Sequence, residues 1–264
     1  MRVIVTGAAS GIGRSICLQV AKRAQKEGRA AAIAAVDMPG NAALSALRDE
    51  LTPLGAQVLL VEEDMMDALA PERIVAGAVK AFDGIDGIVS NAGINCPGAL
   101  TECTVEDWDR VFSVNVRASW LLAKAGAQAL SKSAGSIVNI ASMSGSNAHN
   151  HLGPYGPSKA SLIMLTQVLA QELGPQGVRV NSLSPGMVRT GMTEQVYQNN
   201  AIADARGALV PLGRVALPQD MADVVCFLLG DDARYVTGHD LVVDGGITGN
   251  HLGRLPGLAQ ITRG

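Results

Sequence analysis

The sequence predicts a single α/β domain in which a doubly wound, seven-stranded parallel sheet carries helices on both faces. Short apolar segments rich in Val and Ile alternate with longer segments of helical periodicity, an order typical of βαβ units. The chain has 264 residues, of which 48% are hydrophobic, so one sizeable core is expected. No shift in composition, charged run or internal repeat divides the chain.

Seven segments have the composition of buried parallel strands. Most of them are continuously apolar rather than alternating, as expected where helices cover both faces of a sheet. In chain order, the expected strands are residues 2–6, 31–37, 57–62, 87–90, 136–141, 179–184 and 240–243.

Six helices are expected between these strands, and two of them have recognisable starts. Thr104 is a suitable N-cap, and two acidic residues follow it near the positive end of the helix dipole. Pro218 marks the start of the last helix in a similar way. The expected helices are residues 12–27, 42–54, 71–82, 105–130, 154–173 and 219–229.

Two segments fall outside this alternation. Residues 191–214 are polar, rich in alanine and weakly periodic, and their place between a strand and the last helix suits a substrate lid. Residues 247–264 mix Gly, Pro, Leu and Arg without a clear period. We expect them to form a C-terminal tail that is disordered or docks on a neighbouring subunit.

Charge and composition exclude several function classes. A net charge of −3 and a pI near 5.8 provide no basic field for nucleic acid. No secretory signal and no apolar stretch long enough for a membrane span are seen, so we expect a soluble, cytoplasmic protein without a membrane partner. The four cysteines are expected to be free thiols, and His149 and His151, the only close histidine pair, indicate no metal site.

A glycine-rich turn follows the first expected strand and precedes a helix. It contains Gly7, Ser10, Gly11, Ile12 and Gly13. Glycines at such a turn allow a pyrophosphate to approach the backbone, and the helix N-terminus presents free N–H groups to the anion. The spacing Gly-x-x-x-Gly-x-Gly departs from the common pattern, and a plain surface turn is the alternative. The strand–turn–helix context favours a dinucleotide-binding Rossmann fold.

Asp37 ends the second expected strand and indicates which dinucleotide binds. An acidic residue at this distance from the glycine turn typically receives the adenosine ribose hydroxyls. It would repel a 2′-phosphate, and neither Met38 nor Ser10 supplies a positive charge, so NAD(H) is favoured over NADP(H). Asp64, after the third strand, is expected near the adenine amino group. The alternatives are a capping role for Asp37 and an ordinary loop position for Asp64.

Tyr155 and Lys159 are four residues apart in an expected helix and therefore share one face. A tyrosine that relays protons near neutral pH needs its pKa lowered by about 3 units, and a nearby ammonium favours the phenolate. Ser142 directly follows the fifth strand, where doubly wound folds collect ligands. Pro157 is harmless in this segment only if a helix begins nearby.

These features together resemble the short-chain dehydrogenase/reductase family. The match covers residues 1–246, because Pro185-Gly186 and Val243-Asp244-Gly245-Gly246 also fit, and it leaves out only the tail. The resemblance implies that Tyr155 is the general acid/base, that Lys159 binds the nicotinamide ribose and lowers the tyrosine pKa, and that Ser142 orients the reacting oxygen. Asn115 is similar to the family asparagine that holds a water next to the lysine; a structural hydrogen bond is the alternative.

The resemblance also implies further cofactor contacts and an assembly. Asn91, Ala92 and Gly93 would line the adenosine side, and Pro185, Gly186, Val188 and Thr190 would approach the nicotinamide, with Thr190 bonded to the carboxamide. Family members usually form dimers or tetramers through two long helices, here residues 105–130 and 154–173, so a homotetramer or homodimer is expected.

The expected reaction is reversible hydride transfer between NAD(H) and a secondary alcohol or ketone. Polar residues between 94 and 152 suit a polyol or sugar-like substrate, whereas Met143, Met187 and Met192 suit a cyclic alcohol. One alternative is an NADP(H)-dependent 3-oxoacyl-thioester reductase of the same family. Another is an NAD-binding sensor without catalytic activity.

Overall fold

Seven parallel strands form one sheet in the order β3-β2-β1-β4-β5-β6-β7. The computed structural model describes residues 1–191 and 193–250. Its strands are β1 (Arg2–Thr6), β2 (Ala32–Asp37), β3 (Gln57–Glu62), β4 (Gly87–Ser90), β5 (Ser136–Ile140), β6 (Arg179–Pro185) and β7 (Asp240–Val243). This architecture confirms the predicted α/β fold class, including the number of strands.

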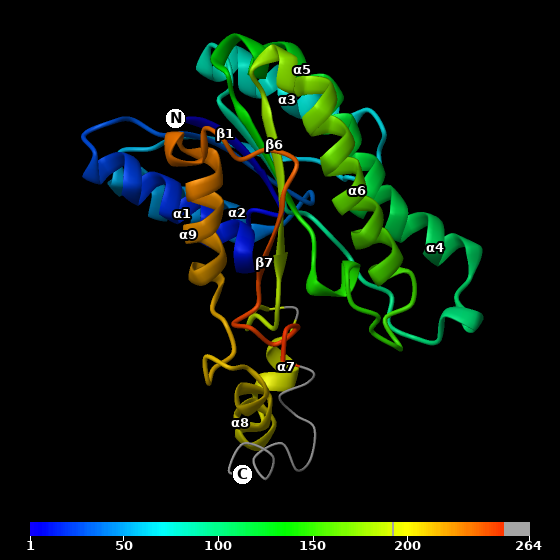
Figure 1. Ribbon diagram of the computed structural model, residues 1–264. Helices are drawn as coiled ribbons and strands as arrows, with labels where there is room; N and C mark the ends of the chain where they lie inside the picture. The colour runs from blue at the N-terminus through cyan, green and yellow to red at the C-terminus, as the bar shows by residue number, and fades with distance from the viewer. Residues whose placement is uncertain (192, 251–264) are drawn as a thin grey trace, which may run out of the picture.

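Helices cover both faces of the sheet (Figure 1). The larger helices are α1 (Gly11–Lys26), α2 (Ala42–Leu51), α3 (Ala70–Phe82), α4 (Val105–Phe112), α5 (Ala118–Ser133), α6 (Tyr155–Leu173), α8 (Asn200–Leu209) and α9 (Pro218–Leu229). One core cluster lies under α1, α2 and α9, and a second lies under α3, α5 and α6. Their inner faces bury Leu, Ile, Val and Ala side chains against the strands, and this burial is the main source of stability.

The chain reverses its direction of winding between β1 and β4, since β1 pairs with β2 on one side and β4 on the other. Ligands of doubly wound sheets bind outside the carboxyl ends of the strands at such a switch point. The loops after β1, β2, β4, β5 and β6 therefore define where a site is expected.

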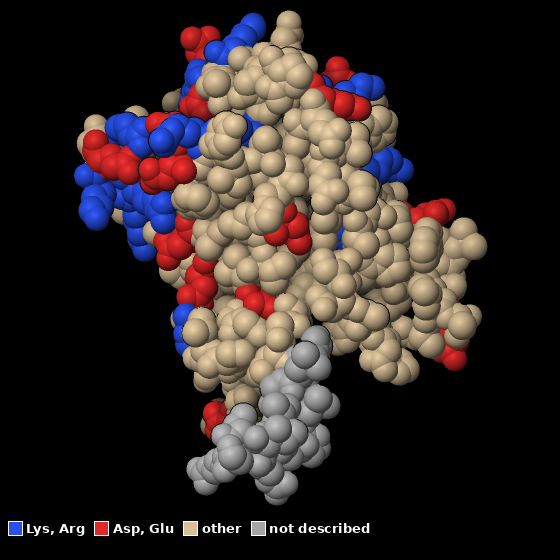
Figure 2. Space-filling model, viewed as in Figure 1, with Lys and Arg blue, Asp and Glu red and all other residues tan. Residues whose placement is uncertain are grey.

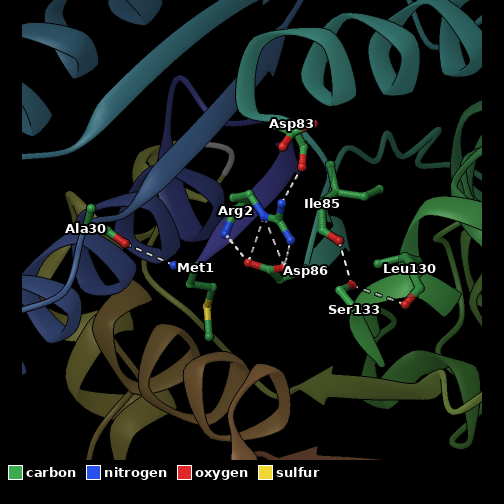
Figure 3. Close-up of polar contacts among 8 residues, drawn as sticks. All are labelled: Met1, Arg2, Ala30, Asp83, Ile85, Asp86, Leu130 and Ser133. Atoms are coloured by element: carbon green, nitrogen blue, oxygen red, sulfur yellow. Dashed lines mark hydrogen bonds and ion pairs between the residues drawn. The ribbon is translucent and has the colours of Figure 1, made fainter.

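Polar contacts join neighbouring elements at the amino ends of the strands, opposite the expected site (Figure 3). The Arg2 backbone N–H donates to Asp86 at 2.8 Å, and its guanidinium also pairs with that carboxylate. Ser133 Oγ donates to the Ile85 carbonyl at 2.7 Å. These bonds join the start of β1, the approach to β4 and the end of α5, away from the carboxyl edge.

The expected helix over residues 105–130 is confirmed as continuous helical structure but is not uniform. A π-helical stretch, Ser113–Arg117, separates α4 from α5, and α5 extends to Ser133. The predicted cap is confirmed, because Thr104 Oγ1 accepts from the Asp107 N–H at 3.1 Å. The helix expected at 42–54 ends as α2 at Leu51 and continues as a 3-10 turn, Thr52–Leu54.

The segment expected as a lid contains two helices that periodicity did not identify, α7 (Glu194–Tyr197) and α8. Both lie beyond the carboxyl edge of the sheet (Figure 1). Of the expected tail, only residues 247–250 are described. Thr248 anchors them, since its hydroxyl donates to Asp244 Oδ2 at 2.6 Å. No helix within 1–191 and 193–250 is long and apolar enough to cross a membrane.

Candidate active site

The glycine turn connects β1 to α1 in the conformation that the sequence predicts. Gly7 and Gly11 have φ values of +65° and +54°, which favour glycine. Gly13 is required by space, because a Cβ there would lie 2.1 Å from the Gly7 carbonyl oxygen. The Ser10 side chain makes no capping bond to the start of α1. The first N–H groups of α1 are therefore available to an anion.

Thr6 and Asn91 fasten this turn to the loop after β4. Thr6 Oγ1 accepts from the backbone N–H groups of Asn91 and Ala92, each at 3.0 Å. Asn91 Nδ2 donates to the carbonyl oxygens of Thr6 at 2.9 Å and Gly7 at 3.1 Å. Thr6 was not among the predicted site residues; its position at the end of β1, directly before the first glycine, was the available signal.

Asp37 lies against the glycine turn at the end of β2. Its Oδ2 accepts from the Ala9 N–H at 2.9 Å, and its Oδ1 accepts from Met38 N at 2.9 Å and Asn41 Nδ2 at 3.0 Å. These bonds hold the carboxylate beside the glycine turn. Asp64 lies on the same side of the cavity described below, with its Oδ1 bonded to the Met66 N–H at 2.8 Å.

A cavity of about 670 Å³ runs along the carboxyl edge of the sheet. It collects most of the predicted site residues. The predicted residues in its wall are Gly7, Ser10, Gly11, Ile12, Asp37, Asp64, Asn91, Ala92, Gly93, Ser142, Tyr155, Lys159, Pro185, Gly186, Val188 and Thr190. Gly13 and Asn115 are not in the wall; they lie directly behind it.

Ser142, Tyr155 and Lys159 come together in this cavity. Tyr155 is the first residue of α6, so Pro157 falls in the first helical turn, where no backbone N–H is needed. Ser142 follows β5, and its Oγ accepts from the Ser144 N–H at 3.1 Å. Lys159 is 4% exposed, and its Nζ donates to the Ile140 carbonyl at 2.7 Å.

The pKa directions differ from the sequence-based expectation. Burial raises the pKa of Tyr155, and a side-chain hydrogen bond with Ser142 opposes that rise. Lys159 Nζ lies 5.7 Å from the centroid of the Tyr155 ring, and burial lowers the pKa of this ammonium to about 8. The hydrogen bond from Ser142, rather than the ammonium, is therefore what favours the phenolate here.

Asn115 lies at the centre of the π-helical stretch and is fully buried. Its Oδ1 accepts from the Ile94 N–H at 2.9 Å, and its Nδ2 donates to the Ile94 carbonyl and Ser158 Oγ, each at 3.0 Å. A Cβ on Gly93 would lie 3.3 Å from both Asn115 Oδ1 and Lys159 Nζ. Asn115 thus makes structural hydrogen bonds, which was the alternative to a role in holding water. It also lies beside Lys159, as the family role requires.

The loop after β6 forms the other end of the cavity. Thr190 is held by Thr193, whose Oγ1 accepts from the Thr190 N–H at 3.0 Å. Val188 pairs with Ala216 in an isolated parallel bridge. A Cβ on Gly186 would lie 2.6 Å from Asp244 Cα, so a larger residue would push this loop away from β7.

Only part of the region between residues 94 and 152 that was expected to bind the substrate lines the cavity. Among its polar residues, Ser144 and His149 line the cavity, joined by a 3.3 Å contact between Ser144 Oγ and His149 Nδ1. Met143 and Met187 also line it, whereas Met192 lies outside the described residues. The wall also includes Arg110, Tyr197 and Arg206, which the sequence analysis did not name.

Within the described ranges, no three His, Cys, Asp or Glu side chains are grouped so as to hold a metal ion. Cys17, Cys96, Cys103 and Cys226 are free thiols.

Comparisons with known proteins find a family model and relatives that match nearly the whole chain. A family model described as enoyl-(acyl carrier protein) reductase matches residues 7–248. The (3R)-3-hydroxyacyl-CoA dehydrogenase of Rattus norvegicus is 38% identical over 254 residues, which cover 92% of this chain and 95% of the relative.

Two solved structures have the same fold. A short-chain type dehydrogenase/reductase from Mycobacterium marinum is 32% identical, with a TM-score of 0.83 and coverage of 94% of this chain and 95% of that one. A protein from Beutenbergia cavernae, assigned as an NAD(P)-dependent gluconate 5-dehydrogenase and solved with bound NADP at low occupancy, is 33% identical. Its TM-score is 0.84, with coverage of 94% and 96%.

Proposed function

The chain belongs to the short-chain dehydrogenase/reductase family, and on this basis we propose that it is an NAD(H)-dependent secondary-alcohol dehydrogenase. It is an oxidoreductase that acts on alcohols with a nicotinamide cofactor. The finer proposal rests chiefly on one observation. Tyr155, Ser142 and Lys159 line the same cavity as the glycine turn and Asp37.

The cavity has the parts that a nicotinamide dinucleotide needs. Free N–H groups at the start of α1 suit the pyrophosphate, and the carboxylate of Asp37 suits the two ribose hydroxyls of NAD(H). The loop containing Pro185, Gly186, Val188 and Thr190 suits the nicotinamide end. When bound there, the cofactor supplies or accepts the hydride.

The side chains of α6 and the β5 loop are suited to proton transfer. In oxidation, Tyr155 as the phenolate takes the proton of the substrate alcohol and becomes the neutral phenol, and in reduction the phenol returns that proton to the ketone oxygen. Ser142 donates a hydrogen bond to that oxygen and holds it beside the tyrosine. Lys159 is buried beside the Tyr155 ring, where its ammonium can donate hydrogen bonds to the ribose hydroxyls.

Asp37 supports NAD(H) as the cofactor. Its two oxygens already accept three hydrogen bonds from the turn and from Asn41, so the carboxylate is held in place. No Lys or Arg follows it in the loop, where Met38, Pro39 and Gly40 stand instead. A 2′-phosphate would meet an uncompensated negative charge.

The second candidate is an NADP(H)-dependent 3-oxoacyl-thioester reductase. It is favoured by the likeness to the rat 3-hydroxyacyl-CoA dehydrogenase and by the NADP bound in the Beutenbergia cavernae structure. The catalytic residues would be the same, and only the cofactor and the substrate tail would differ.

Initial rates with NAD and NADP over secondary alcohols, polyols, sugar acids and 3-hydroxyacyl thioesters test both candidates. We expect NAD-dependent turnover that Tyr155→Phe lowers at least a thousandfold, while NADH binds the variant with nearly unchanged affinity. Substantial activity in Tyr155→Phe would contradict the assigned proton donor. A clear preference for NADPH with a 3-oxoacyl thioester would favour the second candidate.

A further inference from the structure

Arg206 is a cationic side chain in the cavity wall without a carboxylate partner among the described residues. Most described arginines pair with Asp or Glu, including the other cavity arginine, Arg110, which lies 3.0 Å from Asp107. Arg117, Arg179 and Arg234 also lack such a partner; they donate to backbone carbonyls and are not part of the cavity wall. Arg206 therefore brings an unneutralised charge to this site.

Tyr197 holds Arg206 in place. The guanidinium lies over the Tyr197 ring, 5.4 Å from its centroid, and Nη1 donates to the Tyr197 hydroxyl at 3.4 Å. Tyr197 itself is only 2% exposed, so the ring is a fixed platform. A guanidinium has five N–H donors, and most of them are left for a ligand.

The acidic and the basic side chains of the cavity wall come from different parts of the fold. The carboxylates in its wall, Asp37, Glu63 and Asp64, all come from the ends of β2 and β3. Glu63 is paired with Arg73. The part of the wall formed by α6 and the segment after β6 contains Lys159 and Arg206 but no described carboxylate. Such a separation attracts an anion to the end opposite the proposed adenosine site.

We infer that Arg206 binds an anionic group of the substrate, so that the enzyme acts on secondary alcohols that carry a carboxylate or a phosphate. This inference rests on the proposed function, because the substrate hydroxyl must reach Tyr155 and Ser142. Arg206 favours such a group through paired, charge-assisted hydrogen bonds. Arg206 is thus a residue of substrate specificity.

Three pairs of substrates, each an anion and an uncharged counterpart, test the inference. They are gluconate and sorbitol, 3-hydroxybutyrate and its methyl ester, and glycerol 3-phosphate and glycerol. The first two pairs probe a carboxylate, and the third probes a phosphate. We expect the wild-type enzyme to prefer the anion of at least one pair by tenfold or more in kcat/KM.

Arg206→Gln is expected to remove that preference, mainly by raising KM for the anion at least tenfold, with less than a threefold effect on the neutral counterpart. Arg206→Lys should keep part of the preference. Arg234→Gln is the matched control, because it removes an exposed arginine that also lacks a carboxylate partner among the described residues and is not part of the cavity wall. It should leave both members of each pair unchanged.

A binding measurement separates this inference from the proposed function. Calorimetric titration of the NADH-loaded protein with malonate and with inorganic phosphate should show binding that Arg206→Gln weakens at least tenfold. If the anion binding depends on Arg206 but no alcohol is turned over, the proposed function fails and the inference stands. If alcohols are turned over and Arg206→Gln affects anion and neutral substrate equally, the inference fails. It also fails if the variant loses NADH affinity to the same extent.

Discussion

The buried charge of Lys159 lowers the stability of the folded protein, although the proposed active site needs it. Its ammonium is buried, with the Ile140 carbonyl as its hydrogen-bond acceptor, and burial lowers its pKa from 10.5 to about 8. A shift of that size corresponds to about 3 kcal/mol against the charged form. Because the unfolded chain binds this proton more tightly, the penalty is fully present below pH 8 and falls as the pH rises toward 10.5.

Lys159→Met is therefore expected to stabilise the protein while abolishing turnover. Subtracting about 1–2 kcal/mol for the lost hydrogen bond to Ile140, we expect the free energy of unfolding at pH 7 to rise by about 1–2 kcal/mol. The gain should shrink above pH 8. Urea denaturation at pH 7 and pH 9.5 measures it, with Lys80→Met, on the exposed side of α3, as the control. A destabilised Lys159→Met at pH 7 would contradict the argument.

Asp37 offers a second test at the scale of one residue. Asp37→Asn removes the charge but keeps an oxygen for the Ala9 N–H, so the glycine turn should remain folded. We expect kcat/KM with NADP to rise at least tenfold relative to that with NAD. Glu62→Gln, a nearby charge change outside the cavity wall, is the control. An unchanged cofactor ratio in Asp37→Asn would show that this carboxylate does not select the cofactor.

At the scale of elements, the start of α1 depends on close packing against β1 and the loop after β4. A Cβ on Gly13 would lie 2.1 Å from the Gly7 carbonyl oxygen and 2.6 Å from Asn91 Nδ2. Gly13→Ala should therefore lower the free energy of unfolding by about 1–3 kcal/mol and weaken NADH binding at least tenfold. Gly77→Ala in α3 meets no atom within 4 Å and should instead stabilise by about 0.5–1 kcal/mol. Thermal melts and NADH titrations compare the two variants.

Most elements were predictable from the sequence because buried strands appear as short apolar runs and the longer helices have a helical apolar period. The apolar runs fixed all seven strands to within one residue at either end. The π-helical stretch around Asn115 was not predictable, because it depends on hydrogen bonds from Asn115 to Ile94, more than twenty residues away. Helix α7 was missed because it has only four residues, and α8 was missed because Gly207 is its one buried residue, so neither helix shows an apolar stripe.

At the scale of the molecule, the fold explains why the candidate site was predictable and its specificity was not. Parallel strands deliver the loops after β1, β2, β5 and β6 to one edge of the sheet, so motifs scattered along the sequence meet there. The proposed role of Arg206 depends instead on which side chains surround it in the folded protein. Its lack of a carboxylate partner is a property of the packed molecule and has no signal in the local sequence.

The outer faces of α5 and α6 carry exposed apolar side chains, which is relevant to the dimer or tetramer expected from the family resemblance. Trp120 is 45% exposed, and Met164 and Val168, one helical turn apart on α6, are 58% and 44% exposed. The only charged residues of α6 are the buried Lys159 and, in its last turn, Glu172. Figure 2 shows the surface over α6 largely free of charge, whereas charges gather over α1 and α2. Uncharged faces with exposed apolar side chains are typical of subunit interfaces.

We therefore expect a dimer or tetramer that assembles through α5 and α6. Light scattering coupled to gel filtration should give a mass of two or four chains of 27.2 kDa each. Met164→Glu should shift the protein to a smaller species with unchanged circular dichroism, because the buried charge would lack a partner at the interface. Leu217→Glu, at an exposed position before α9 on the other face of the sheet, should keep the wild-type mass. A wild-type monomer, or equal effects of both variants, would argue against this interface.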